Sequence, residues 1–274
     1  MGSRDWGGHN KKCAVMNGIA QRVPILVYHH VYADDEVVHA GAAPGVIALT
    51  EFVRQMHWVR DTDWTVVSTS NLVDWLTNDS TLPKHACVIH FDNGWLDTYA
   101  VALPVLADLG FLATCYPITS GVEAASINRS ARVRTLTEGW VEKPFMSWDK
   151  LGALREAGWD IGAHTHTHCK IADEYETEGD NGVLGEMIAA NECFMKRLGL
   201  VPEHFAYPSG SRNDRTDRLL ANVYRSIRLW HWEWPIRWTF TDRNTSVCGI
   251  HSQNIDTRVT FADFQRVFEE AAAI

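Results

Sequence analysis

Short apolar runs alternate along the chain with longer segments whose apolar residues recur every three or four positions. The short runs are rich in β-branched and aromatic residues and lack strict alternation with polar ones, which is typical of strands buried on both faces. The pattern predicts eight strands, at residues 23–28, 64–68, 86–91, 111–117, 159–163, 204–208, 225–230 and 247–251.

The segments between these runs predict amphipathic helices. One begins near Thr50, and another has Ser147 as its N-cap and Gly158 as its stop. A helix over residues 181–199 ends at Gly199, and a last one covers residues 260–274. We expect the apolar positions of the third helix on one inner face: Leu184, Met187, Ile188, Met195 and Leu198.

Repeated strand–helix units imply a parallel sheet with helices around it. About eight strands in one domain of this length suggest a barrel closed by helices, and a doubly wound open sheet is the alternative. No GxGxxG motif follows the first strand, so we do not expect a dinucleotide site. We interpret residues 1–22 as a loose N-terminal lead-in and residues 23–274 as one domain.

Composition narrows the class of protein. The chain is 46% hydrophobic and 22% charged, as in globular proteins, and its net charge of −9 argues against a nucleic-acid partner. No apolar run reaches the roughly 18 residues that a transmembrane segment needs. We recognise no signal peptide, which favours a cytoplasmic location. The six cysteines are scattered, as expected for core residues in a reducing compartment. The sequence leaves the oligomeric state open.

Polar residues recur directly after the predicted strands. His29 and His30 follow the first, Asp92 and Asn93 end the third, and His251 ends the eighth. The carboxyl ends of parallel strands open on one face of a barrel, where active sites of such barrels lie. We therefore expect these side chains to form one site.

The sharpest local signal is HTHTH, which follows the fifth strand. His164 and His168 stand four residues apart, so both imidazoles can face one point as half of a zinc site. Asp92 or Asn93 could supply a further ligand, and a carboxylate beside a metal can act as general base. His166 points elsewhere at this spacing. The alternatives are a surface loop with chance histidines and an Asx turn at Asp92–Asn93.

Four segments together resemble a known family: VPILVYHHV, VIHFDNGWLDTYAVALPVLADLGFLAT, IGAHTHTH and HFAYPSG. In this order and spacing they are similar to polysaccharide deacetylases of the NodB-homology type, carbohydrate esterase family four, and especially to the branch with poly-N-acetylglucosamine deacetylases. The similarity covers roughly residues 23–270. It implies a distorted (β/α) barrel of seven to eight parallel strands. It also implies removal of N-acetyl groups from an amino-sugar glycan or glycoconjugate with a divalent metal, most often zinc.

The resemblance also implies roles for individual residues. Asp92 matches the general base, and Asn93 stands where the family has a metal-binding Asp. His164 and His168 match the metal-ligating histidines. The turn at YPSG implies that the Ser209 backbone N–H contacts the oxyanion, and His251 matches the proton donor to the leaving amine. The metal would then lower the pKa of a water that it binds, so that Asp92 can activate this water.

Aromatic residues near the strand ends are candidates for sugar binding. We expect Tyr207, Trp230 and Trp232 to contact the substrate, although alternate residues of a strand can also be core. The family's third motif usually carries an Arg that braces the catalytic Asp, whereas HFAYPSG has none. Arg212 or Arg215 could take its place.

Asn93 leaves three explanations open. The chain could hold its metal more weakly, the Asn could be an introduced change that disables the enzyme, or the protein could bind glycans without hydrolysing them. A hydrolase of another C–N bond, such as a cyclic amide or imide, is a further alternative. A cytoplasmic enzyme would favour a small glycoconjugate over an extracellular polymer.

Overall fold

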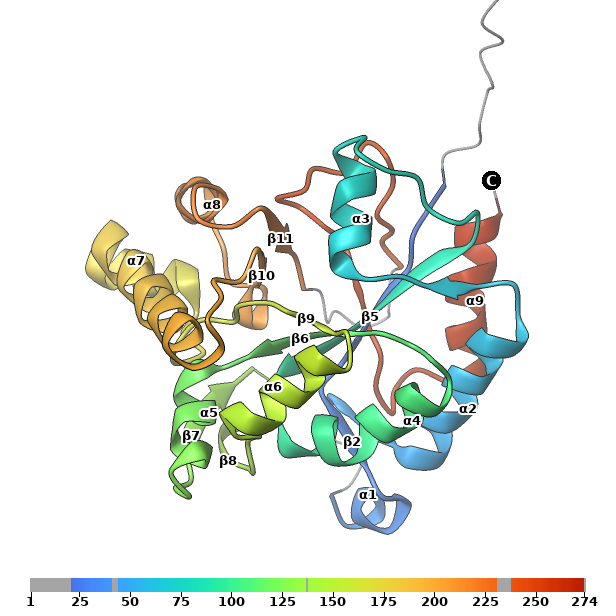
Figure 1. The fold of residues 1–274 in the computed structure, drawn as a ribbon, viewed down its shortest axis with the longest axis horizontal. Coiled ribbons are helices and arrows are strands. Elements are labelled where there is room, and N and C mark those ends of the chain that lie inside the picture. The colour runs from blue at the N-terminus through green and yellow to red at the C-terminus, as the bar shows by residue number, and fades with distance from the viewer. Residues whose placement is uncertain (1–20, 41–43, 137, 231–237, 274) are drawn as a thin grey trace, which may run out of the picture.

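A ring of short parallel strands forms the centre of the molecule (Figure 1). The computed structural model describes residues 21–40, 44–136, 138–230 and 238–273. The main sheet has the order β12-β1-β5-β6-β9, with β4 paired to the start of β5. Its strands are β1 Ile25–Tyr28, β4 Thr65–Val66, β5 Ala86–Asn93, β6 Thr114–Pro117, β9 Asp160–Ile161 and β12 Gln253–Asn254.

A second parallel pair completes the ring. β10 (His204–Ala206) pairs with β11 (Ser226–Arg228). The isolated bridge Ala163–Phe205 links this pair to the chain just after β9, and the bridge Arg228–Ile250 links it to the chain just before β12. In the described part of the chain the central strands are thus all parallel and curve around one another, which agrees with the expected distorted barrel and confirms the α/β class.

Helices surround the ring. In the view of Figure 1, α2, α4 and α6 lie below the strands, α3 lies above them and α9 lies to their right. No described helix is long and apolar enough to cross a membrane. The α-helices are α1 Asp34–Ala40, α2 Leu49–Asp61, α3 Thr69–Leu76, α4 Leu103–Asp108, α5 Thr119–Ser126, α6 Trp148–Glu156, α7 Ile171–Leu198, α8 Asp214–Ala221 and α9 Phe261–Ala272. A π-helix, η1, covers Thr98–Ala102, and a 3₁₀ turn, η2, covers Pro208–Gly210.

Two small sheets extend from the carboxyl side of the ring. β2 (His30–Tyr32) pairs in parallel with β3 (Val46–Ala48). β7 (Arg132–Thr135) and β8 (Gly139–Glu142) form an antiparallel hairpin. Neither was predicted, because both are short and lie outside the repeating strand–helix pattern.

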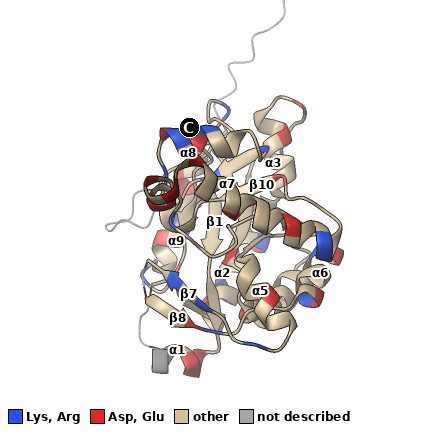
Figure 2. Cartoon of the chain, turned by 90° about the vertical axis from the view of Figure 1, so that its left-hand side faces the viewer, with Lys and Arg blue, Asp and Glu red and all other residues tan. Residues whose placement is uncertain are grey.

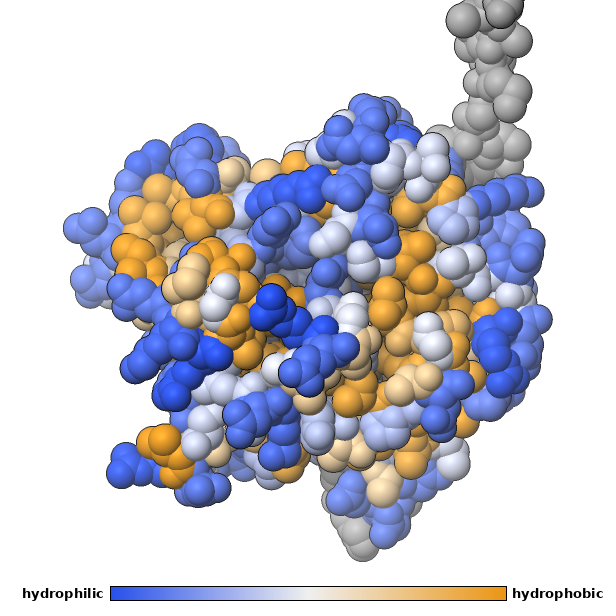
Figure 3. Space-filling model, in the orientation of Figure 1, coloured by the Kyte–Doolittle hydropathy of each residue, from blue (hydrophilic) through white to orange (hydrophobic). Residues whose placement is uncertain are grey.

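Most predicted elements lie where the pattern placed them, but three details were wrong. The strand expected at residues 247–251 is replaced by β12, and only Ile250 bridges to the ring there. Along α7, Ile188 and Met195 are 57% and 52% exposed rather than inward, and hydrophobic residues are visible over this helix in Figure 3. α7 also begins ten residues earlier than predicted and kinks at Gly179, where φ is 64°.

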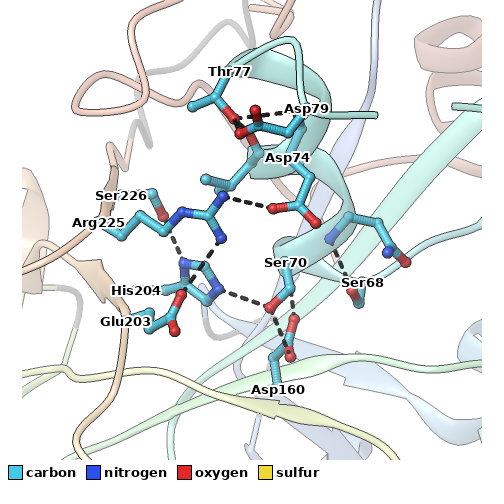
Figure 4. Close-up of polar contacts among 12 residues, drawn as sticks. Ser68, Ser70, Asp74, Thr77, Asp79, Asp160, Glu203, His204, Arg225 and Ser226 are labelled. Carbon is cyan, nitrogen blue, oxygen red and sulfur yellow. Dashed lines mark hydrogen bonds and ion pairs between the residues drawn. The ribbon is translucent and has the colours of Figure 1, made fainter. Parts of the chain in front are cut away.

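A polar cluster ties together the amino ends of three strands (Figure 4). Ser70 donates its backbone N–H and its hydroxyl to Asp160, at 2.9 and 3.2 Å. The Asp160 carboxylate only accepts, so the Nε2–H of His204 donates to the Ser70 oxygen at 3.1 Å. Its Nδ1 is then left to accept from the Ser226 hydroxyl at 2.9 Å. Each buried polar group here has a partner, so the cluster fixes α3 against β9, β10 and β11.

Candidate active site

A narrow cleft lies at the carboxyl ends of the strands, where the sequence pattern placed the chemistry. Its volume is about 30 Å³, which is enough for one or two water molecules. Residues from six elements or their loops line it. The predicted ones are His29, Asp92, Asn93, His164, His168, Ser209 and Trp230, and the aromatic rings of Trp95 and His30 line it as well.

β5 delivers the acid and the amide because its end turns sharply. All eight residues of β5 are buried, and Asn93 adopts a left-handed φ of 73°. Asn tolerates this conformation better than most residues do. Gly94 follows at φ 80°, and a Cβ there would lie 2.7 Å from the Cβ of Pro117. The turn therefore requires glycine, and it holds Asp92 and Asn93 side by side at the wall of the cleft.

Asp92 is held as a carboxylate by Arg228. One guanidinium nitrogen lies 2.6 Å from both carboxylate oxygens, and both side chains are almost completely buried. Burial alone would raise the pKa of Asp92, but Arg228 and the neighbouring imidazoles outweigh it and lower this pKa to about 2. Because burial keeps His164 and His29 neutral at neutral pH, Arg228 is the positive charge that matters there.

The arginine that pairs with Asp92 is Arg228, and not Arg212 or Arg215 as the sequence suggested. Arg212 pairs with Asp217 on α8, and Arg215 pairs with Asp180 on α7, so neither approaches Asp92. Arg228 lies within β11, and its guanidinium also sits 5.3 Å from the Tyr116 ring. An arginine in the middle of the apolar run RSIRLW was the signal that could have identified it.

The two histidines expected to bind metal are oriented by backbone carbonyls. Nδ1 of His164 lies 2.8 Å from the Ala206 carbonyl, and Nδ1 of His168 lies 2.7 Å from that of Arg134. A carbonyl only accepts, so both Nδ1 atoms carry the proton and both Nε2 atoms keep a lone pair. The ring centroids are 5.0 Å apart. Burial lowers the pKa of His164 to about 3 and also lowers that of His168, which keeps the lone pairs free.

The loop that carries these histidines is strained and held from outside. Thr165 and His168 both have φ near 64°, an unusual value for a β-branched residue such as Thr165. The Thr165 hydroxyl accepts from the His168 N–H, and Glu186 of α7 accepts from the N–H groups of His166 and Thr167. The His166 ring contacts Thr119 at 2.9 Å, outside the cleft, and so points away from His164 and His168 as expected.

The residues present form a donor set that suits a divalent metal. Two imidazoles with free Nε2 atoms share the cleft with Oδ1 of Asn93, a buried oxygen that no described residue hydrogen-bonds. Carbonyl-anchored imidazoles are typical of zinc ligands. No group of three or more His, Cys, Asp or Glu side chains able to hold a metal occurs in the described ranges, because the third donor here is an amide. The three donors, two imidazoles and one amide oxygen, carry no charge, and the negative charge near them in the cleft is that of Asp92.

Among the described imidazoles, His29 rather than His251 lies within 4.0 Å of the Asp92 carboxylate. Nε2 of His29 lies 3.9 Å from Oδ2 of Asp92, and its ring lines the cleft. Burial lowers the pKa of His29 to about 4, an effect that Asp92 partly opposes. His251 is absent from the lining residues, because its backbone is hydrogen-bonded in both directions to Thr241 rather than extended in a barrel strand. His29 was visible in the sequence at the end of the first strand.

The aromatic residues expected to bind sugar have different places. Trp230 lines the cleft, packs edge-on against His29 at 6.0 Å and donates to Asn254 at 3.3 Å. Tyr207 is fully buried and donates its hydroxyl to Asp217 at 2.7 Å, so it packs the ring rather than facing the cleft. Trp232 lies outside the described residues.

The carboxyl end of the parallel strands thus brings together an Asp paired with Arg and two carbonyl-anchored His residues. The family model described as polysaccharide deacetylase matches residues 79–225, more than half of the chain. The chain therefore belongs to the polysaccharide deacetylase family, and the resemblance seen in the sequence is confirmed.

A curated relative and solved structures agree with this assignment. The Bacillus subtilis (strain 168) protein YxkH, described as a polysaccharide deacetylase, is 22% identical over 71% of this chain and 59% of its own length. The chain thus spans about three-fifths of that relative. The Streptococcus pyogenes deacetylase PplD has a TM-score of 0.74 at 18% identity, over 91% of this chain and 99% of its own. IcaB from Ammonifex degensii has a TM-score of 0.71 at 20% identity, over 92% and 97%. At these identities the two structures show the shared fold.

Proposed function

We propose that the protein removes the acetyl group from an N-acetylated amino sugar in a glycan or glycoconjugate, with a bound divalent metal, most often zinc in such sites. The observation that carries the proposal is that one cleft holds all the groups this reaction needs. They are a carboxylate paired with Arg228, two imidazoles with free Nε2 lone pairs and an amide oxygen with no hydrogen-bond partner among the described residues. His164, His168 and Asn93 would hold the metal. When bound, the ion would polarise the amide carbonyl and make the attacking water more acidic.

The side chains of the cleft divide the proton transfers between them. Asp92 takes a proton from the water whose oxygen adds to the carbonyl carbon. The C–N bond then breaks, the nitrogen takes the proton that Asp92 accepted, relayed by the neutral His29 imidazole 3.9 Å from Asp92, and acetate leaves. The backbone N–H of Ser209, which lines the cleft with a left-handed φ of 55°, is our candidate donor to the oxyanion. Arg228 keeps Asp92 ionised before this proton transfer.

Acetate release is the direct test. The chain is stripped with a chelator, reloaded with zinc, desalted and incubated with an N-acetylglucosamine tetramer. We expect about one retained zinc and zinc-dependent acetate release, both lost in His164→Ala and His168→Ala. His57→Ala is the matched control, because His57 is an exposed residue of α2. Zinc retention without acetate release from any acetylated glycan would contradict the proposal.

The neutral donor set favours one competing function, glycan binding without hydrolysis. An amide oxygen attracts a dication less than a carboxylate does. Asn93→Asp decides between the two functions. We expect it to raise zinc affinity about tenfold or more, since about 1.4 kcal/mol of added attraction suffices. If only Asn93→Asp releases acetate while the unmodified chain binds the tetramer, the chain is a binding relative with a disabled site.

A further inference from the structure

A larger cavity lies beside the cleft and shares part of its wall. Its volume is about 420 Å³, within the roughly 300–1,000 Å³ of small-molecule sites. Thr135, His168 and Ser209 line both spaces. A sugar whose acetamido group enters the narrow cleft would therefore extend its neighbouring residue into this second cavity.

One wall of this cavity is the β7–β8 hairpin, which presents two arginines and a tryptophan. Alternation along β7 turns Val133 inward, where it packs with Trp95 and Phe145, and leaves Arg132 and Arg134 outward. Trp140 on β8 is the cross-strand partner of Arg134, and it is 61% exposed. Figure 2 shows the basic residues on β7. The hairpin thus offers a flat ring next to two guanidinium groups.

These arginines lack the carboxylate partners that most of the described arginines have. Arg132 lies over the Trp140 ring at 5.6 Å, and neither Arg132 nor Arg134 has an ion pair within 4.0 Å among the described side chains. Like charges two residues apart on one strand face repel each other. An anion bound between them would relieve this repulsion.

The acidic residues of the cavity belong to α7 and not to the hairpin. Asp173 is 4.0 Å from Lys170, which offsets its charge, and Glu174 belongs to the first turn of α7 beside Gly182. Glu142 faces Arg132 across the hairpin in register but makes no ion pair with it. The hairpin wall consequently stays positive in a chain whose net charge is −9.

We propose that this cavity is a subsite for an acidic group on the sugar next to the one that is deacetylated. Trp140 stacks on the sugar face, and Arg132 and Arg134 bind a carboxylate or phosphate through charge-assisted hydrogen bonds. The inference rests on the proposed function and narrows its substrate class to anionic glycans carrying N-acetylated residues.

Equilibrium binding tests this subsite independently of turnover. The probes are a neutral N-acetylglucosamine tetramer, the same tetramer carrying one 6-phosphate, and a hyaluronan tetrasaccharide, which supplies carboxylates. Calorimetry is performed on the unmodified chain, on Arg132→Gln/Arg134→Gln, and on the control Lys84→Gln/Arg129→Gln. The control removes the same charge from exposed positions outside the cavity.

We expect at least one acidic probe to bind about tenfold more tightly than the neutral tetramer at low salt, falling several-fold at about 0.5 M salt. The double arginine variant loses this preference and the control keeps it. Which acidic probe is preferred tells phosphate from carboxylate. The variants Arg132→Lys and Arg134→Lys keep the positive charge at these positions. We expect them to retain most of the preference, so that its loss in the double glutamine variant reflects the lost charge and not misfolding.

Equal binding of all three probes, or a preference that survives in the double arginine variant, would overturn the subsite. Acetate release from the neutral tetramer is followed in parallel. Release without an acidic preference would leave the proposed function standing and remove the subsite. An acidic preference without release from any probe would support the subsite and count against hydrolysis.

Discussion

The two ends of the strand ring contain the same kinds of buried polar side chain, but they differ in how completely these are paired. At the amino ends, His204, Ser70, Asp160 and Ser226 satisfy one another, as Figure 4 shows. At the carboxyl ends, Nδ1 of His29, Oδ1 of Asn93 and Nε of Arg228 have no hydrogen-bond partner among the described residues.

Backbone conformation shows the same difference. Of the six described non-glycine residues with positive φ, Asn93, Thr165, His168 and Ser209 lie at the carboxyl end, and the other two, Asn78 and Asn128, follow helices. Unpaired buried groups and strained backbone both cost stability, so they persist where the surrounding structure enforces them, typically at functional sites. The comparison teaches that the amino end stabilises the barrel and the carboxyl end holds groups ready for a ligand. Four measurements would sharpen or break it.

The largest effect is expected for Asp92→Asn. The amide cannot take a proton from water, so acetate release should fall about 10²–10⁴-fold. The fall should occur in kcat rather than in binding of the glycan, as measured by initial rates and by calorimetry. Retention of activity within a few-fold would show that Asp92 is not the base.

Arg228→Met should cost about 3–5 kcal/mol of unfolding free energy, because it leaves the buried Asp92 charge without its partner. Urea unfolding measures this cost. The control is Arg225→Met at the amino end, whose pairs with Asp74 and Glu203 are 36% exposed on the arginine side. Its loss should be within about 1 kcal/mol. Equal losses in the two variants would contradict the view that the buried pair is special.

Acid should destabilise the metal-free chain through its buried imidazoles. Burial lowers the pKa of His29 to about 4 and of His164 to about 3, and lowers that of His204 as well. The unfolded chain binds protons near pH 6.5, whereas the fold does not. The stabilisation is therefore complete above pH 6.5 and is lost as pH falls toward the folded pKa values.

The loss should approach about 1.4 kcal/mol per pH unit for each such imidazole. Urea unfolding of the metal-free protein between pH 7 and pH 4 measures it. Unfolding free energies that stay constant over this range would show that these imidazoles are protonated in the fold.

The smallest effect is expected for Ser226→Ala at the amino end. It leaves Nδ1 of His204 unpaired and should cost about 1–3 kcal/mol of stability. Acetate release per folded molecule should stay within twofold, since the cluster is remote from the cleft. A large loss of kcat with little loss of stability would mean that the two ends are coupled.

The sequence by itself determined the barrel and half of the site. Buried β-branched runs alternating with amphipathic helices specify a parallel ring, and polar residues at the strand ends specify where chemistry collects. Asp92, Asn93 and His164 were placed in this way, because each ends or directly follows its strand and the fold brings the strand ends together. His168 was placed by its spacing of four from His164, and Ser209 by the family resemblance.

Only the tertiary structure decided which distant residues complete the site. Arg228 reaches Asp92 across 136 residues of chain, and His29 rather than His251 approaches the carboxylate. Such pairings depend on the order of strands around the ring and on local turns, such as the one that ties His251 to Thr241. Periodicity along the chain records burial and secondary structure, but it does not record which strands become neighbours.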